Sequence, residues 1–160
     1  MRLGKRLSEV LETREETGDE ALDNLVSLFP NYPEREYEIK ASLDGVDVPL
    51  FGRLDCFDSE RLRIGEIKSG RLWTQKMVDE SGQLKMYALL VWLTYKRAPA
   101  EVILYWAKTQ YTDNGELKFT GEIESFETKI TLDDVLIFSD RVREAWAGIK
   151  NLCEEHYGII

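Results

Sequence analysis

The chain has few of the residues that build thiol or imidazole sites, with two cysteines and one histidine among 160 residues. Cys56 and Cys153 cannot form a disulfide framework or a four-thiolate metal site; the pattern around each predicts burial. His156, near the C-terminus, is expected to lie at the surface or to contact a partner. A Ser-His hydrolase and a histidine-rich metal centre are therefore disfavoured.

Long apolar runs are also missing. The longest, residues 88–93, is too short to cross a bilayer, and no apolar signal segment follows the basic start of the chain. No repeat, low-complexity tract or linker divides the sequence, and its length and 43% hydrophobic content fit one domain over residues 1–160. We therefore expect a single soluble, intracellular, cytoplasmic domain with no membrane contact.

Positive charge is scarce, and the net charge is −9. Proteins that bind nucleic acid usually present a basic surface, so the bulk charge favours a protein partner or simple solubility. Six basic residues nevertheless cluster along one part of the sequence, and we expect them to crowd around a single site: Arg53, Arg61, Arg63, Lys68, Arg71 and Lys76.

Hydrophobic spacing and turn residues predict the elements of the fold. Helices are expected over residues 3–16, 19–28 and 74–96 and from Thr131 towards the C-terminus, with Gly82 a weak point in the third. Strands are expected over 35–43, 46–57, 62–68, 101–109 and 117–129, with 101–109 central in the sheet. The order predicts an α/β (α+β) protein with a mixed sheet of about five strands flanked by helices.

Two local features refine this expectation. Asp44-Gly45 is a strong tight-turn pair, which predicts a hairpin between the first two strands. The last helix carries an apolar stripe at helical spacing, which predicts core packing along its length: Val135, Phe138, Val142, Trp146, Ile149 and Cys153.

The clearest chemistry lies on the second and third expected strands. Glu66 and Lys68 are two residues apart and share a face, and Asp55 on the neighbouring strand, about 4.8 Å away, can converge on them if the register allows. Two adjacent carboxylates are costly unless a cation such as Mg²⁺ joins them. Such an ion polarises a phosphate and lowers the pKa of a bound water, which Lys68 would orient or deprotonate. The pattern predicts a hydrolytic site for a phosphodiester.

An ordinary surface ion-pair network is the competing interpretation, because an acid two residues before a lysine is a common pattern. The context favours the site. A hairpin delivers Asp55, Ser69-Gly70 closes the next strand, and the helix that follows carries Gln83 and Tyr87 on one face.

Three strings resemble the PD-(D/E)XK nuclease superfamily in its RecB-type, Cas4-like branch: Gly-Arg-Leu-Asp at 52–55, Glu-Ile-Lys-Ser-Gly at 66–70, and Gln-Leu-Lys-Met-Tyr at 83–87. The resemblance covers roughly residues 35–92 and implies a restriction-endonuclease-like core. It implies that Asp55, Glu66 and the Ile67 backbone carbonyl hold Mg²⁺ or Mn²⁺. It further implies that Lys68 is catalytic and that Gln83 and Tyr87 organise the site and touch DNA.

The sequence departs from that branch at its first helix. The branch often has glycine, three residues, then histidine, whereas here Gly4 is followed by Ser8 and then by Leu11-Glu12. Serine is a poor ligand for Mg²⁺. Either Glu12, Glu15 or Glu16 supplies a further oxygen, or Asp55 and Glu66 hold the ion alone. Two cysteines cannot hold an iron–sulfur cluster, so none is expected.

We therefore expect a Mg²⁺- or Mn²⁺-dependent deoxyribonuclease acting on single- or double-stranded DNA, with an exonuclease of recombination, repair or phage DNA processing as the leading form. The expected nucleic-acid contacts are Arg71, Trp73, Lys76 and Tyr87, with Trp73 placed to stack on a base, whereas Trp106 is expected in the core. The alternative is a non-catalytic nucleic-acid-binding or protein-interaction module that keeps this fold. A homo-oligomer or a protein partner is compatible with both.

Overall fold

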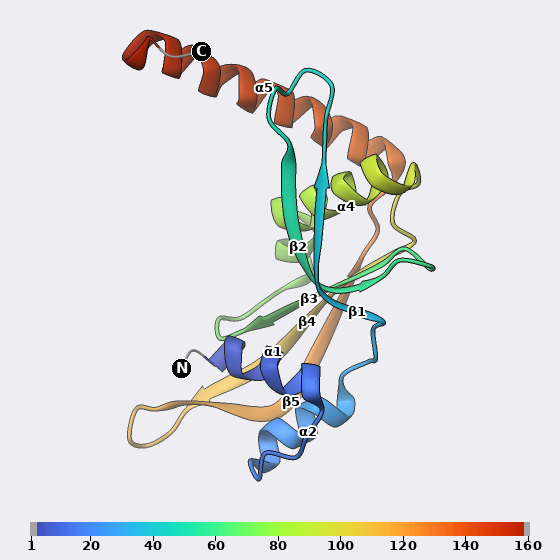
Figure 1. The fold of residues 1–160 in the computed structure, drawn as a ribbon. Coiled ribbons are helices and arrows are strands. Elements are labelled where there is room, and N and C mark those ends of the chain that lie inside the picture. The colour runs from blue at the N-terminus through green and yellow to red at the C-terminus, as the bar shows by residue number, and fades with distance from the viewer. Residues whose placement is uncertain (1–2, 159–160) are drawn as a thin grey trace.

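The computed structural model describes residues 3–158, apart from the side chain of Tyr157 (Figure 1). Within that range the elements follow in the order α1 (Leu3–Thr13), α2 (Glu20–Leu28), β1 (Glu34–Ala41), β2 (Leu50–Asp58), β3 (Arg63–Ser69), α3 (Gln75–Asp79), α4 (Gly82–Tyr95), β4 (Glu101–Tyr111), β5 (Leu117–Thr128) and α5 (Leu132–Tyr157). Asp19 caps α2 by accepting a hydrogen bond from the Leu22 backbone N–H, as its position predicts.

The five strands form one mixed sheet in the order β1-β2-β3-β4-β5. Strands β1, β2 and β3 are antiparallel, β3 and β4 are parallel, and β4 and β5 form an antiparallel hairpin. The parallel pair is possible because α3 and α4 carry the chain back across the sheet between β3 and β4. The expected mixed sheet with flanking helices is confirmed, and β4 has a strand on each side.

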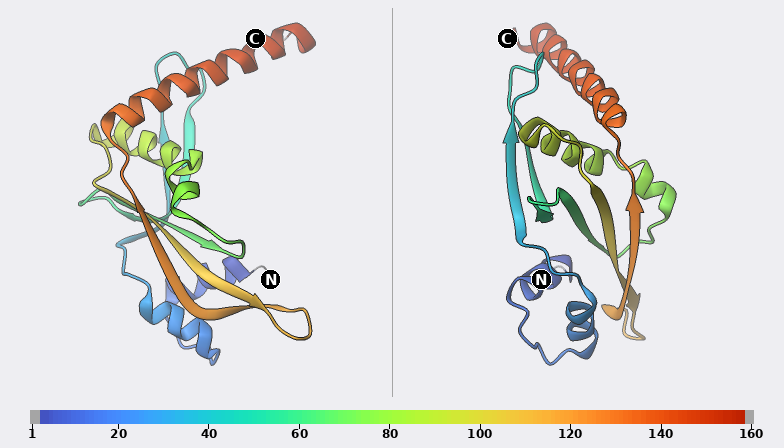
Figure 2. Two further views of the ribbon diagram at one scale, coloured as in Figure 1. Left: turned by 180° about the vertical axis from the view of Figure 1, so that it is seen from behind. Right: turned by 90° about the vertical axis from the view of Figure 1, so that its right-hand side faces the viewer.

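Helices cover both faces of the sheet (Figure 2). On one face α4 and α5 pack on a core that includes Leu54, Leu89 and Leu104, with Trp106 buried beside them as expected. On the other face α1 and α2 pack on a second core that includes Leu7 and the buried Cys56. The β2 strand therefore contributes to both cores.

The β1–β2 hairpin separates from the rest of the sheet. Pairing between β2 and β3 ends at Cys56 and Gly65, whereas β2 stays paired with β1 as far as Leu50 and Ala41. Figure 1 shows this hairpin standing away from β3. Asp55 is the first residue of β2 on the separated side, so it lies at a fork between the two strands.

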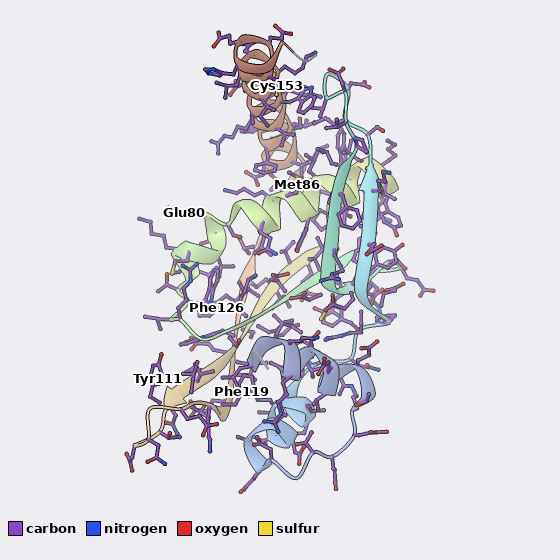
Figure 3. All side chains as sticks on the ribbon, turned by 60° about the vertical axis from the view of Figure 1, so that its left-hand side comes forward. Glu80, Met86, Tyr111, Phe119, Phe126 and Cys153 are labelled. Carbon is purple, nitrogen blue, oxygen red and sulfur yellow. The ribbon has the colours of Figure 1, made fainter. Side chains whose placement is uncertain are left out.

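The single helix expected over residues 74–96 is wrong. The chain forms two helices, α3 and α4, which are separated at Glu80 and Ser81 (Figure 3). The Ser81 side chain accepts a hydrogen bond from the Leu84 backbone N–H and so begins α4. Serine favours such a cap over a helix interior, and this preference ends the first helix before Gly82.

The hairpin and the turn expected at Asp44-Gly45 are confirmed, but the strand ends expected directly beside the turn are wrong. Ala41 pairs with Leu50, so residues 42–49 form a longer connection between the strands. Gly45 does adopt a positive φ of 86°, which glycine tolerates, and the Val46 N–H bonds the Leu43 carbonyl. A local turn is present, but the loop around it sets the register of the hairpin.

The apolar stripe along α5 packs on the core only as far as Trp146. Thr131 and Asp134 form the capping box that begins this helix. Beyond Trp146 the expected burial is wrong, because Ile149 is exposed and Cys153 is only half-buried. Figure 1 shows the end of α5 running past the β1–β2 hairpin. Despite its length, α5 is not apolar enough to cross a membrane, and neither is any other helix within residues 3–158.

Candidate active site

A cavity of about 880 Å³ opens at the fork between β2 and β3, bounded also by α1, β1 and α4. Its charged lining residues are Lys5, Glu9, Glu12, Glu36, Arg53, Asp55, Glu66 and Lys68. Five carboxyl groups thus face three cationic side chains, and this excess of acid favours a bound cation over a bound anion. An anionic ligand would need a cation beside it to offset the repulsion.

Asp55 occupies the fork. Its Oδ2 accepts a hydrogen bond of 2.8 Å from the Ile67 backbone N–H, which has no strand partner on β2. Burial raises the pKa of Asp55, the Ile67 N–H opposes that shift, and the charge of Glu36 adds to it. The carboxyl group therefore stands where a strand-to-strand bond would otherwise form, facing other acids.

Glu66 is the most buried acid of the site, with 2% of its surface exposed. Its Oε1 accepts a hydrogen bond of 2.5 Å from Lys68 Nζ, but its buried Oε2 has no hydrogen-bond partner. Burial raises the pKa of Glu66 to about 7, and the neighbouring Asp55 adds to the shift. A buried, unpartnered carboxylate oxygen beside a second carboxylate fits a divalent cation as a ligand.

A chain of hydrogen bonds links Lys68 to α4. Lys68 Nζ donates to Gln83 Oε1 at 2.9 Å, Gln83 Nε2 donates to Tyr87 Oη at 2.7 Å, and Tyr87 Oη donates to the Arg53 carbonyl at 2.9 Å. Burial raises the pKa of Tyr87 to about 12, so it stays a donor at neutral pH. The structure thus brings together the expected residues Asp55, Glu66, Lys68, Gln83 and Tyr87.

Gly52 lets α4 approach β2 closely enough for this chain to form. A Cβ atom at residue 52 would lie 2.5 Å from a methyl carbon of Leu90 and 3.4 Å from the Tyr87 ring. Any larger residue would require the Leu90 side chain or α4 itself to shift. The glycine in the Gly-Arg-Leu-Asp string therefore has a packing role that directly positions Tyr87 against the Arg53 carbonyl.

Glu36 is a residue of the cavity that sequence reasoning missed. The register places it opposite Asp55, between the pairs Arg35–Cys56 and Tyr37–Leu54. Ser8 Oγ donates to Glu36 Oε1 at 2.9 Å, and Arg53 Nε lies 2.9 Å from Glu36 Oε2. Ser8, at the position where the resembled branch has histidine, thus contacts the site through Glu36.

The first helix, expected to run to residue 16, ends at Thr13, so Glu12 lies in α1 and Glu15 and Glu16 lie beyond it. Glu12 lines the cavity, whereas Glu15 and Glu16 do not, so only Glu12 of the three expected alternatives is near the site. Within residues 3–158, no three histidine, cysteine, aspartate or glutamate side chains lie close enough together to hold a metal ion. The available donors are therefore the pair Asp55 and Glu66, with Ile67 also lining the cavity.

The expected nucleic-acid contacts on the segment after β3 lie outside the cavity lining. The Arg71 guanidinium lies 4.9 Å from the centre of the Trp73 ring, and Trp73 is half-buried against the core. Lys76 is exposed, 3.9 Å from Glu80. Tyr87 is the one residue of the expected contact set that lines the cavity.

The expected crowding of six basic residues is also wrong. Of the six, only Arg53 and Lys68 line the cavity. Arg61 pairs with Asp58 in the turn before β3, and Arg63 pairs with Glu101 at the start of the strand. These two arginines therefore form ion pairs with acids outside the cavity and do not line it.

Comparison with known proteins adds little to this geometry. No family model matches the chain, and no curated protein matches it. A crystal structure of SSO0001 superposes with a TM-score of 0.48 and 20% sequence identity, covering 92% of this chain and 59% of that one. The chain thus spans 59% of the length of that protein.

Proposed function

We propose that this protein is a Mg²⁺- or Mn²⁺-dependent DNA nuclease that hydrolyses phosphodiester bonds. The observation that carries the proposal is the buried Glu66, whose unpartnered Oε2 lies in a site shared with Asp55 and Lys68. The resemblance of the three strings to PD-(D/E)XK nucleases supports the same reaction. The restriction-endonuclease-like core that it implies stays a prediction.

Asp55 and Glu66 would hold the cation, with the Ile67 carbonyl as a further donor. When bound, the cation would polarise a phosphate oxygen and lower the pKa of a water molecule. The excess of carboxyl groups in the cavity is then partly neutralised, which lets an anionic backbone approach. Glu66 loses its burial penalty in the same event, because its orphaned oxygen acquires a partner.

Lys68 would act on the phosphate or on the attacking water. Its ammonium group is fixed between Glu66 and Gln83, and Tyr87 fixes Gln83 in turn. A cation held in this way can stabilise the negative charge that develops on the phosphorus oxygens. Glu66 and Gln83 both accept hydrogen bonds from Lys68 Nζ, which keeps the amino group oriented before substrate binds.

The test is cleavage of end-labelled single- and double-stranded DNA in Mn²⁺ by the wild-type protein and by Lys68→Ala. We expect degradation by the wild type and a loss of about 100-fold or more in the variant. Lys118→Ala is the matched control, because Lys118 is an exposed lysine outside the cavity. Equal degradation by the wild type and Lys68→Ala would contradict the proposal.

A non-catalytic nucleic-acid-binding or protein-interaction module is the second candidate. The net charge of −9 and the lack of a three-residue metal cluster within residues 3–158 favour it. Calorimetric titration with Mn²⁺ separates the two. Binding that disappears in Asp55→Asn supports the nuclease, whereas no binding, or binding that Asp55→Asn leaves unchanged, supports the module.

A further inference from the structure

The β2 strand presents a second set of residues to the cavity, beside those assigned to catalysis. Phe51, Arg53 and Asp55 alternate along the strand, and all three line the cavity. Phe51 is 59% exposed, and among the lining residues it is the exposed large apolar side chain. A phenyl ring open to water at a cavity gains favourable free energy when a ligand covers it.

Arg53 is held in place rather than left free. Arg53 Nε forms an ion pair with Glu36 Oε2, and Ser8 Oγ donates a hydrogen bond to Glu36 Oε1. This arrangement orients the guanidinium and leaves its two terminal amino groups for a ligand. Paired amino groups of an oriented guanidinium match the oxygens of a phosphate.

The backbone at Glu36 indicates that this arrangement is imposed. Glu36 has a φ of 48°, although it lies within β1 and is not glycine. Such a conformation is uncommon for residues with a Cβ atom and tends to occur at functional sites. Here it directs the Glu36 carboxylate to Arg53 and Ser8, beside Asp55.

We propose that Phe51 and Arg53 form a binding ledge for single-stranded DNA. Arg53 would contact a backbone phosphate, and an adjacent base would stack on Phe51, so that the strand runs along β2 towards Asp55. Only an unpaired base exposes its face to such a ring, so the ledge selects single strands over duplex. The inference rests on the proposed nuclease function and names its substrate class.

The test is fluorescence anisotropy with a labelled single-stranded oligonucleotide and with a hairpin duplex of the same sequence, in Mn²⁺. All proteins carry Lys68→Ala to keep the DNA intact, which a gel verifies. We expect Phe51→Ala to weaken single-strand binding about tenfold and to leave duplex binding unchanged. Arg53→Gln should reduce the slope of log affinity against log salt by about 0.7, which corresponds to one phosphate contact on a single strand.

Two matched controls accompany these variants. Tyr111 is an exposed aromatic residue (75%) at the end of β4, outside the cavity lining (Figure 3), and Arg61 is an exposed arginine paired with Asp58. Tyr111→Ala and Arg61→Gln should bind like the parent. Equal losses in Phe51→Ala and Tyr111→Ala, an unchanged salt slope in Arg53→Gln, or no single-strand binding at all would overturn the ledge.

The failure of this inference and the failure of the proposed function are distinguishable. If single-strand binding depends on Phe51 but the wild type shows no Mn²⁺-dependent cleavage, the ledge is supported and the nuclease function is contradicted. If the wild type cleaves DNA but Phe51→Ala and Arg53→Gln do not alter binding, the nuclease function is supported and the ledge is contradicted.

Discussion

The two sides of the cavity are built differently. The inner wall comes from β2, β3 and α4, and its members are joined by direct hydrogen bonds or by burial: Asp55, Glu66, Lys68, Gln83 and Tyr87. The rim comes from α1, β1 and the open side of β2, and it includes Ser8, Glu36, Phe51 and Arg53. On the wall Glu66 is buried, whereas on the rim Phe51 and Arg53 are exposed. Under the proposed function, changes to the wall should act on catalysis and metal binding, and changes to the rim on the binding of a DNA strand.

The largest effect is expected from Glu66→Gln, on the inner wall. The amide removes one of the two carboxylates offered to the cation, so Mn²⁺ affinity and Mn²⁺-dependent cleavage should each fall about 100-fold or more. Calorimetry and the end-label assay measure the two losses.

Glu12→Gln is the control for that variant, because Glu12 is an exposed acid that lines the same cavity. It should retain most of both activities. A loss in Glu12→Gln as large as that in Glu66→Gln would place a first-helix acid among the metal ligands and erase the distinction between wall and rim.

Gly52→Ala should destabilise the fold by about 1–3 kcal/mol, because the added methyl group overlaps the buried Leu90 side chain and forces that side chain or α4 to shift. Gly148→Ala is the matched control, since residue 148 is a helical position in α5 with open space around it. There alanine should stabilise by about 0.5–1 kcal/mol. Chemical denaturation measures both changes, and equal effects would show that α4 packs more loosely on the wall than described.

The pH dependence of folding stability should reflect the protonation of the Glu66 carboxyl group. Its pKa is raised in the folded protein to about 7 from an ordinary value of 4.5, so the folded state binds its proton more tightly than the unfolded chain does. Its contribution to stability is therefore complete below pH 4.5 and is lost as the pH rises through 7. In EDTA the wild type should lose thermal stability between pH 5 and pH 8, and Glu66→Gln should lose less.

Addition of Mn²⁺ at pH 8 should raise the melting temperature of the wild type more than it does at pH 5, because the cation replaces the proton at Glu66. Parallel melting curves for the wild type and Glu66→Gln across this pH range, with no Mn²⁺ effect, would show that the buried acid does not control stability.

The smallest effect is expected from Ser8→Ala, on the rim. The variant loses one hydrogen bond to Glu36, which loosens Arg53 and should weaken single-strand binding by about two- to threefold. Mn²⁺ affinity should not change. If Ser8→Ala instead lowers Mn²⁺ affinity as strongly as Glu66→Gln does, Ser8 belongs to the wall.

The wall residues could be predicted from the sequence because their side-chain directions follow from spacing within single strands and helices. Glu66 and Lys68 share a face through strand alternation, and Gln83 and Tyr87 share one through the helical repeat. The mixed sheet followed from the order of apolar segments in the same way.

The place of Glu36 on the rim could not be predicted, because it depends on the register between β1 and β2. A two-residue turn at Asp44-Gly45 would pair Asp55 with Glu34, but the longer loop of residues 42–49 pairs it with Glu36. The predicted burial of the end of α5 was wrong for a related reason. Helical spacing shows which residues share a face, but it does not show how far the sheet and α4 extend beneath Ile149 and Cys153.

The hydrogen bond between Asp55 and the Ile67 N–H at the fork has a consequence for metal selectivity. Asp55 Oδ2 accepts a hydrogen bond from that backbone group and Glu66 Oε1 accepts one from Lys68, so each acid has one oxygen free of these bonds. Ca²⁺ favours bidentate carboxylates and six to eight protein oxygens, whereas Mg²⁺ binds one or two carboxylates and keeps several waters. Under the proposed function, the fork would therefore favour a small octahedral ion that keeps waters available for hydrolysis.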